Sequence, residues 1–307
     1  MFEVNIIDFI FLSLAFMITC TGFLINNFES YMPAFVMKGF KYGSFAYRGP
    51  GGNFLDAIEI SKSYYRHFYS TSTVFNAVTL FYMFLVYYLD FGVNKYIWAV
   101  LRFILEQEQP AVSVSAALIA MSLLTIQCAR RFYETHYLQV FAKNSKMNLT
   151  HYTAGIIHYL GCTITIIGAA PLFCGSQNRE SITWTDTWTK YITMPCILTF
   201  IWAWYEQYQS NIIFANLRRD KKSGAVVTED HGIPHGRKFE LVSSPHRMCE
   251  VIIYTVLAFL VPTKTYFCIY AWVLANQILT AKQADDWYKL TFKTYPKNRK
   301  AIFPYLL

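Results

Sequence analysis

Seven apolar segments constrain the fold of this 307-residue chain more than any other feature of its sequence. They are residues 6–25, 74–91, 111–128, 152–174, 191–210, 251–261 and 266–281. A helix needs about 20 apolar residues to cross a hydrocarbon core about 30 Å thick, so most of these segments approach membrane-spanning length. With 54% hydrophobic and only 15% charged residues, the chain is too apolar for an ordinary soluble domain. The segments therefore predict an all-α, multi-pass integral membrane protein with seven transmembrane helices.

Basic residues are divided unevenly among the loops that join these segments. Residues 26–73, 129–151, 211–250 and the chain after residue 281 hold 22 of the 27 Lys and Arg residues. Because positively charged loops stay in the cytosol, this bias predicts a lumenal N-terminus and a cytosolic C-terminus. Residues 96–105 are too short to span the bilayer and are interpreted as an interfacial segment.

The loop formed by residues 211–250 holds seven basic residues and three histidines. Such a cluster suits a phosphate-bearing partner, because Arg and Lys donate charge-assisted hydrogen bonds to phosphate oxygens. The alternative is that the loop only keeps its flanking helices on the cytosolic side. Its sequence DHGIPHG indicates a turn of fixed shape. Nucleic acid is not expected as a partner, because no basic helix accompanies the charge, and no metal site is expected, because the cysteines lack ligand spacing.

Polar residues at the ends of the apolar segments are candidates for function, because ionisable groups near hydrocarbon are costly. Arg130 and Glu134 lie four residues apart and are predicted to pair on a helix, whereas Arg131 points about 100° away. The alternative is that both arginines only reach for the membrane surface.

A second set follows the fifth segment. Gln207, Asn211 and Arg218 fall on one stripe of a continuous helix, which is suited either to a cofactor or to contacts between helices. His246 and Glu250 are again four apart, and they are interpreted either as a hydrogen-bonded pair or as the boundary of the sixth segment.

Four stretches of the sequence resemble the steroid 5α-reductase family, and most closely its polyprenol reductase branch. They are QPAVSVSAALIAMSLLTIQCARRFYE, NLRRDKKSGAVV, IPHGRKFELVSSPHRMCEVIIY and DDWYKLTFKTYPKNRKAIFPYLL. The resemblance covers approximately residues 61–307. Together with the apolar segments, it predicts a single membrane domain over residues 1–307, in which residues 1–73 hold the first span and a polar connection and residues 74–307 form the reductase core.

The same resemblance implies an NADPH-dependent oxidoreductase of the endoplasmic reticulum membrane that saturates the α-isoprene double bond of a polyprenoid on the way to dolichol, the lipid carrier of N-glycosylation. Transferred residue by residue, its cofactor contacts fall on Arg131, Gln207, Asn211, Arg218, His231, His246, Glu250 and Tyr288. Tyr288 and Glu250 are the candidate catalytic residues.

The sequence departs from the steroid enzymes of this family at two positions. Cys128, a poor hydrogen-bond donor, stands where those enzymes have a catalytic tyrosine, and Ala284 and Asp285 stand where they have a histidine. Glu106 and Glu108 are candidates for an early active-site acid.

Three other functions are considered beside polyprenoid reduction: a steroid 3-oxo-4-ene 5α-reductase, a non-enzymatic lipid transporter or scaffold, and a membrane methyltransferase. Because hydride adds readily to an alkene only when a conjugated group accepts the electron density, the aldehyde polyprenal is the expected immediate substrate.

Overall fold

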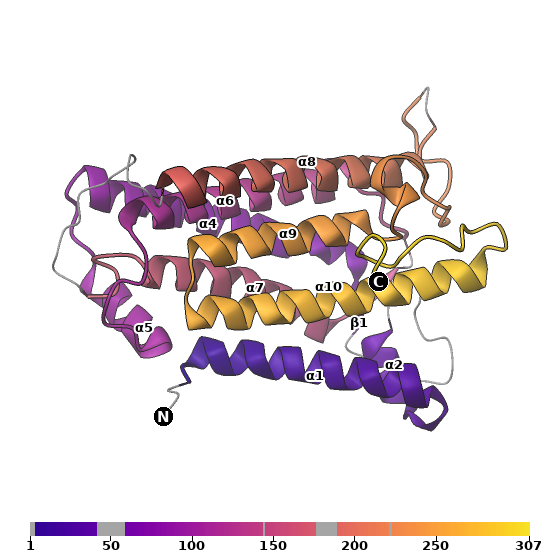
Figure 1. The fold of residues 1–307 in the computed structure, drawn as a ribbon, viewed down its shortest axis with the longest axis horizontal. Helices are drawn as coiled ribbons and strands as arrows, with labels where there is room; N and C mark the ends of the chain where they lie inside the picture. The colour runs from indigo at the N-terminus through magenta and orange to yellow at the C-terminus, as the bar shows by residue number, and fades with distance from the viewer. Residues whose placement is uncertain (1–3, 42–58, 144, 176–188, 221–222) are drawn as a thin grey trace.

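The structure is a computed structural model that describes residues 4–41, 59–143, 145–175, 189–220 and 223–307. Within this part of the chain, long helices run side by side along one axis of the molecule (Figure 1). The long helices are α1 (Ile6–Phe28), α4 (Tyr65–Tyr88), α6 (Val114–Tyr133), α7 (Leu149–Gly168), α8 (Met194–Asn216), α9 (Pro245–Leu260) and α10 (Lys264–Thr291). Most of the described residues are thus helical and hardly any form strands, which confirms the all-α prediction.

Short elements connect or extend these helices. They are η1 (Glu29–Tyr31), α2 (Ala34–Phe40), β1 (Glu59–Ser61), η3 (Lys62–Tyr64), α5 (Lys95–Leu105), η4 (Glu134–Leu138), β2 (Lys146–Asn148), η5 (Thr189–Thr193) and η6 (Arg237–Glu240). The strands β1 and β2 pair antiparallel, with Ile60 opposite Met147. This small sheet joins the chain before α4 to the chain before α7, so the two helices begin at the same end of the bundle.

Several helices extend past the apolar segments that predict them. Helix α8 continues to Asn216 and helix α9 already begins at Pro245, so the loop predicted over residues 211–250 is too long and covers only residues 217–244. Helix α10 likewise runs ten residues beyond position 281. The added turns contain polar residues such as Asn211 and His246 among apolar ones, and Asn211 Nδ2 donates to the buried Glu134 carboxylate at 2.9 Å. We call the end of the bundle that carries residues 217–244 the loop end (Figure 1).

The core is built where helices exclude both water and lipid. Helix α8 packs along α9, α1 along α10, and α4 along α6. Helix α6 is buried on several sides, with Ala117, Ala120 and Leu124 completely enclosed. Close approach of α1 to α7 requires glycine at position 161, because a Cβ there would lie 2.5 Å from the Phe11 ring.

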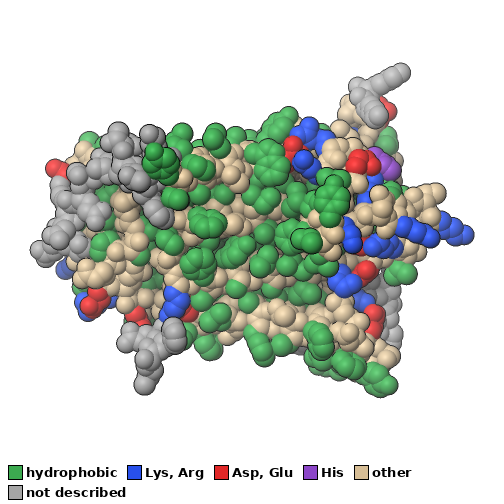
Figure 2. All heavy atoms as spheres, viewed as in Figure 1, with side chains coloured by type: hydrophobic (Ala, Val, Ile, Leu, Met, Phe, Trp, Pro, Cys, Tyr) green, Lys and Arg blue, Asp and Glu red, His purple; other side chains and the backbone are tan. Residues whose placement is uncertain are grey.

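Apolar side chains also cover the outside of the bundle. Among the described residues, two helices are long and apolar enough to cross a membrane by length and composition, over Ile6–Tyr31 and Lys62–Tyr88. Large apolar side chains such as Phe16, Leu198 and Phe267 point outward, and their exposed fractions are 72%, 64% and 51%. Figure 2 shows apolar side chains along the middle of one face and charged side chains gathered toward the loop end. This distribution is the one expected of a bundle surrounded by lipid.

The chain after α10 closes the loop end. Backbone N–H groups of Ser243 and Ser244 donate to the carbonyls of Lys300 and Ala301, at 2.7 Å and 3.1 Å. The Arg299 side chain is buried beneath the loop and donates to the Pro234 carbonyl at 2.9 Å. The C-terminal residues therefore hold the loop and the start of α9 in place.

Candidate functional site

A cavity of about 510 Å³ opens between the helices at the loop end. Its wall is formed by side chains from α4, α6, α7, α8, α9 and α10, together with the loops before β2 and before α9. All eight residues predicted as cofactor contacts line it, namely Arg131, Gln207, Asn211, Arg218, His231, His246, Glu250 and Tyr288. The structure therefore brings these residues together, although they come from four helices and one loop.

A buried hydrogen-bond network forms the wall of the cavity between α6, α8 and α9. The Gln207 amide oxygen accepts from Gln127 Nε2 at 3.1 Å and from Arg130, and its amide nitrogen donates to the His246 carbonyl at 2.9 Å and to Glu250. The predicted pair of Arg130 and Glu134 is confirmed, with a distance of 2.9 Å between Nη1 and Oε1. Because every donor in such a network restricts its neighbours, the network fixes the three helices relative to one another.

Glu250 occupies the point where this network meets the cavity. Its Oε2 atom accepts from Gln127 Nε2 at 3.1 Å and from the Gln207 amide. These donors satisfy a carboxylate that would otherwise be costly so close to hydrocarbon. Of the two interpretations of His246 and Glu250, the hydrogen-bonded pair is wrong, because the donors to Glu250 among the described residues are the amides of Gln127 and Gln207 and not the imidazole.

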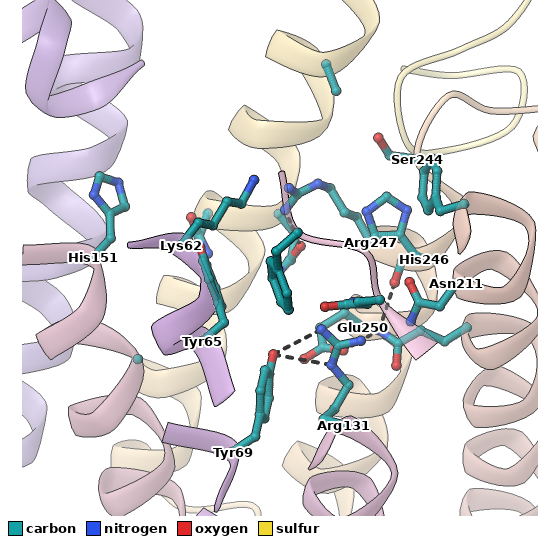
Figure 3. Close-up of a pocket in the computed structure, with 18 of the residues that line it drawn as sticks. Lys62, Tyr65, Tyr69, Arg131, His151, Asn211, Ser244, His246, Arg247 and Glu250 are labelled. Atoms are coloured by element: carbon teal, nitrogen blue, oxygen red, sulfur yellow. Dashed lines mark hydrogen bonds between the residues drawn. The ribbon is translucent and has the colours of Figure 1, made fainter. Parts of the chain in front are cut away.

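Arg131 lies on the cavity side of α6 and is held from two directions (Figure 3). One nitrogen forms an ion pair with the completely buried Glu134. Two other nitrogens, Nε and Nη2, donate to the hydroxyl of Tyr69 at 3.2 Å and 3.1 Å. Asn211 Nδ2 donates to Glu134 Oε2, the oxygen that also pairs with Arg131, at 2.9 Å, so α8 also takes part in holding this carboxylate.

Cationic side chains gather around the mouth of the cavity. Lys62, Arg218 and Arg247 all line it, and the Lys62 ammonium forms no ion pair within the described part of the chain. Arg218 lies just beyond the end of α8, where it donates to the carbonyls of Val140 at 2.6 Å and Asp230 at 3.2 Å. Gln207 and Asn211 share one side of α8 as predicted, but the helix ends at Asn216, so the prediction that it continues through Arg218 is wrong, although Arg218 also lines the cavity.

The electrostatic effect of this cluster is visible at His231. Burial, followed by the charges of Arg218 and Lys62, lowers the pKa of His231 from 6.5 to about 4. The imidazole is consequently neutral at physiological pH. The neighbouring positive charges of Arg218 and Lys62, which make the smaller contribution to this shift, are suited to an anion.

His246 and Tyr288 complete the cavity wall near its mouth. The His246 ring packs edge-on against Phe214, with centroids 5.1 Å apart, and its Nδ1 atom is buried without a hydrogen-bond partner among the described residues. Tyr288 stacks on Tyr295, with centroids 5.2 Å apart and an interplanar angle of 7°. A rigid aromatic and an unused imidazole nitrogen beside cationic groups fit a nucleotide, whose base can stack and whose polar atoms need donors and acceptors.

Several residues singled out from the sequence lie away from the cavity. Glu106 ends α5 and Glu108 pairs with Arg102, and neither lines the cavity, so both are wrong as cavity acids. Cys128 is completely buried and accepts a hydrogen bond from Asn76 Nδ2 at 3.1 Å. Asp285 is bound by Ser243 and by Lys289 at 2.5 Å and has a structural role.

Sequence reasoning missed one wall of the cavity. Lys62, Tyr65 and Tyr69 line it from η3 and α4, in a stretch that the sequence analysis treats as part of a polar connection. Their spacing of three and four residues is the available signal, because it places the three side chains on one face of a helix. The cavity is also lined by His158, Tyr159 and Tyr254. They lie inside apolar segments, where the hydropathy pattern does not distinguish residues that face a cavity from residues of the core.

Comparison with known proteins shows what the chain is similar to. The family model for 3-oxo-5-alpha-steroid 4-dehydrogenase matches residues 162–307. A polyprenal reductase from Drosophila melanogaster is 32% identical over 317 residues, which cover 100% of this chain and 94% of that protein. A polyprenal reductase from Danio rerio is 30% identical over 99% of this chain and 98% of that protein. A polyprenal reductase from Mesocricetus auratus is 30% identical over 81% of this chain and 79% of that protein.

Proposed function

The chain belongs to the polyprenal reductase family, and from this premise we propose that it is an oxidoreductase that uses NADPH to saturate the α-isoprene double bond of a long polyprenoid lipid. The observation that carries the proposal is a single cavity that joins a cationic mouth to an interior of amide, carboxylate and aromatic side chains. Such a cavity accommodates a phosphorylated cofactor and a lipid headgroup together. Saturation of this bond yields the dolichol skeleton on which N-glycans are built.

The residues at the mouth fit the phosphate-bearing half of NADPH. Lys62, Arg218 and Arg247 supply positive charge, and the neutral His231 supplies a further hydrogen-bonding group. Guanidinium groups bind phosphate by donating paired N–H hydrogen bonds to its oxygens. We assign the 2′-phosphate to Arg218, since this residue lies where the loop covers the cavity.

The residues deeper in the cavity fit the reacting half of the cofactor. Glu250 presents an acceptor next to Gln207 and Asn211, and a carboxamide offers both N–H donors and a carbonyl acceptor. Bound there, NADPH supplies a hydride. Glu250 then acts by fixing the ring that carries this hydride, Arg131 holds the polar groups around it, and Tyr288 encloses the cofactor at the mouth.

The chemistry favours the aldehyde as the immediate substrate. Hydride addition to the β-carbon requires the displaced electron pair to reach an electronegative atom, and the carbonyl of polyprenal provides one through conjugation. An allylic alcohol has no such acceptor. A hydrogen-bond donor near the carbonyl oxygen stabilises the charge that develops there.

We further propose seven transmembrane spans in one domain of residues 1–307, with a lumenal N-terminus and a cytosolic C-terminus, in the endoplasmic reticulum membrane. Support comes from the basic residues on the loop end and from the exposed apolar side chains of α1, α8 and α10. The cavity mouth then faces the cytosol, where NADPH is available, and the interior reaches the depth of the lipid.

Purified protein with NADPH and either polyprenal or polyprenol tests the proposal. We expect turnover of polyprenal, no turnover of polyprenol without an added oxidant, and none of testosterone. Equal turnover of polyprenol would contradict the proposal that the aldehyde is the immediate substrate. Turnover of testosterone alone would indicate a steroid reductase. Absence of NADPH binding would favour a transporter or scaffold.

A further inference from the structure

Tyr69 presents a phenol to the cavity and is bound by a guanidinium group. Its side chain comes from the second turn of α4 and is only 8% exposed. Its hydroxyl oxygen accepts two hydrogen bonds from Arg131, at 3.2 Å from Nε and 3.1 Å from Nη2. Figure 3 shows the two side chains meeting at the cavity wall.

The two hydrogen bonds determine what the phenol can do. Both lone-pair positions of the oxygen face the guanidinium, so the O–H hydrogen is directed away from it. Two charge-assisted donors also withdraw electron density from the oxygen, which makes the O–H a stronger donor. None of the hydrogen bonds of the described residues uses this O–H.

The surroundings hold this geometry rigidly. Arg131 is fixed from behind by the buried carboxylate of Glu134. The Tyr69 ring packs against Phe68 and Tyr159, with centroids 4.6 Å and 5.6 Å apart. A donor fixed in this way needs no reorganisation when charge develops next to it.

Other phenols in the cavity differ in this respect. The Tyr254 hydroxyl is bound to His158 Nε2 at 2.6 Å, so its hydrogen bond is already made within the wall. Tyr159 contacts Tyr69 through its ring, and no guanidinium of the described residues is bound to its hydroxyl. Cys128 does not line the cavity and offers only a weak S–H donor.

We propose that Tyr69 is a catalytic residue that donates a hydrogen bond to the carbonyl oxygen of the polyprenoid aldehyde, with Arg131 acting as the positioning residue. This inference rests on the proposed function. Hydride brings an electron pair to the β-carbon, the π pair of the C=C bond forms a new double bond between the α-carbon and the carbonyl carbon, and the C=O π pair moves to the oxygen. Tyr69 stabilises this oxygen. A proton from water then adds to the α-carbon, which restores the carbonyl and gives the saturated aldehyde.

Tyr69→Phe removes the hydroxyl and keeps the ring contacts. We expect kcat with polyprenal to fall about 100-fold, while KM for NADPH and the quenching of protein fluorescence by NADPH stay within threefold of wild type. The control is Tyr82→Phe on the same helix, whose hydroxyl bonds Asn94 and Gly92 away from the cavity. Its turnover should equal that of wild type.

Fluorotyrosines incorporated at position 69 provide a second measurement that keeps the backbone and ring. Their phenols are more acidic, so kcat should rise with acidity until the phenol ionises and then fall at alkaline pH. A purely structural hydroxyl would give no such trend. Full activity of Tyr69→Phe, or rates independent of phenol acidity, would overturn the inference. Failure of the wild-type protein to reduce polyprenal would instead overturn the proposed function.

Discussion

Two clusters of buried polar side chains lie at opposite ends of the bundle, and they differ in purpose. At the loop end, Gln127, Gln207 and Glu250 are joined by amide hydrogen bonds next to the cavity. At the other end, the Asp8 carboxylate is completely buried and lies 2.6 Å from the Lys264 ammonium. Asn5 there donates to Thr265 Oγ1 at 2.8 Å and to the Leu105 carbonyl at 3.2 Å.

Both clusters join helices that are far apart in the sequence, and both contain buried polar atoms without a hydrogen bond among the described residues, but only the first lies beside the cavity. The Lys62 ammonium and the His246 Nδ1 atom line the cavity without ion pair or hydrogen bond in the described residues. In the Asn5–Thr265 cluster, the bonds end on the starts of α1 and α10 and on the end of α5. A buried polar residue in a membrane bundle therefore indicates function only when its surroundings leave part of its bonding capacity facing a cavity.

The largest effect on turnover is expected from a substitution of Glu250, at the loop end. Replacing it by Gln keeps the size of the side chain and removes the charge. If Glu250 orients the nicotinamide, turnover should fall about 100-fold, because a small misplacement of a reacting group has an effect of this size. Binding of 2′-phospho-ADP-ribose, which lacks the nicotinamide, should stay within threefold.

A neighbouring acid supplies the control for Glu250→Gln. Glu206 lies on α8 and pairs with Arg237 at 2.6 Å, and it does not line the cavity. Glu206→Gln should leave turnover within about twofold of wild type, because this buried acid is paired with the partly exposed Arg237 outside the cavity. A fully active, normally expressed Glu250→Gln variant would end the assignment, and equal losses with the fragment and the whole cofactor would make Glu250 structural.

At the opposite end the expected effect is on stability. Asp8→Asn removes the charge that faces Lys264 and should lower the free energy of unfolding by about 2 kcal/mol, less than for a fully buried pair because Lys264 is half exposed. Turnover should not change. Thermal unfolding in detergent measures the first effect, and Asp286→Asn in the exposed pair with Lys282 is the control. An Asp8→Asn variant that lost turnover at unchanged stability would contradict the structural role assigned to this end of the bundle.

The sequence predicts the helical class and the members of the site better than it predicts the limits of the helices. Spacing places Gln207 and Asn211 on one side of a helix, and both line the cavity, because helical periodicity is a local property of the sequence. Arg218 also lines the cavity, but it lies beyond the end of α8, so its place does not follow from helical spacing. The hydropathy pattern predicts helix limits that are too short, because it contains no information on long-range contacts. Asn211, for example, donates to a buried partner from another helix.

The missed wall of the cavity has a different cause. Lys62 and Tyr69 are brought to the site by the pairing of β1 with β2 and by the packing of α4 against α6, which are long-range contacts. Nothing in the local pattern distinguishes a tyrosine at the membrane surface from one that faces a cavity. The same limit applies to His246 and Glu250, whose spacing suggests a pair although their partners come from other helices.

Within the loop end, Arg218 is predicted to distinguish NADPH from NADH. Arg218→Ala should weaken NADPH about tenfold and NADH much less, because it removes a charge-assisted contact to the additional phosphate. Arg219 provides the matched control, since it donates to the carbonyls of Tyr137 at 3.0 Å and Leu138 at 3.1 Å and does not line the cavity. Titration of both nucleotides against both variants measures the difference. An equal loss for NADPH and NADH would place Arg218 away from the 2′-phosphate.

The smallest effect concerns the protonation of His231. In the protein without cofactor, burial and the cations Arg218 and Lys62 lower its pKa to about 4, against 6.5 for the free side chain. The folded protein therefore binds fewer protons than the unfolded chain between pH 6.5 and 4, and its stability decreases as the pH falls through this window. A bound phosphate neutralises the neighbouring cations and thereby raises the pKa of His231, so that binding is coupled to proton uptake below pH 6.5.

The measurement compares wild type with His231→Gln, because the phosphate of the ligand also titrates in this range and its contribution cancels in the ratio. The ratio of wild-type to variant affinity for 2′-phospho-ADP-ribose should increase about threefold from pH 7.5 to pH 5.5, and calorimetry in buffers of different ionisation enthalpy should detect the uptake only in wild type. The stability of Asp286→Asn and of wild type should show the same dependence on pH, since that pair lies on the surface of α10. A ratio that stays constant with pH would mean that no phosphate approaches His231, and the cationic mouth would then have to bind the cofactor through Lys62 and Arg247 alone.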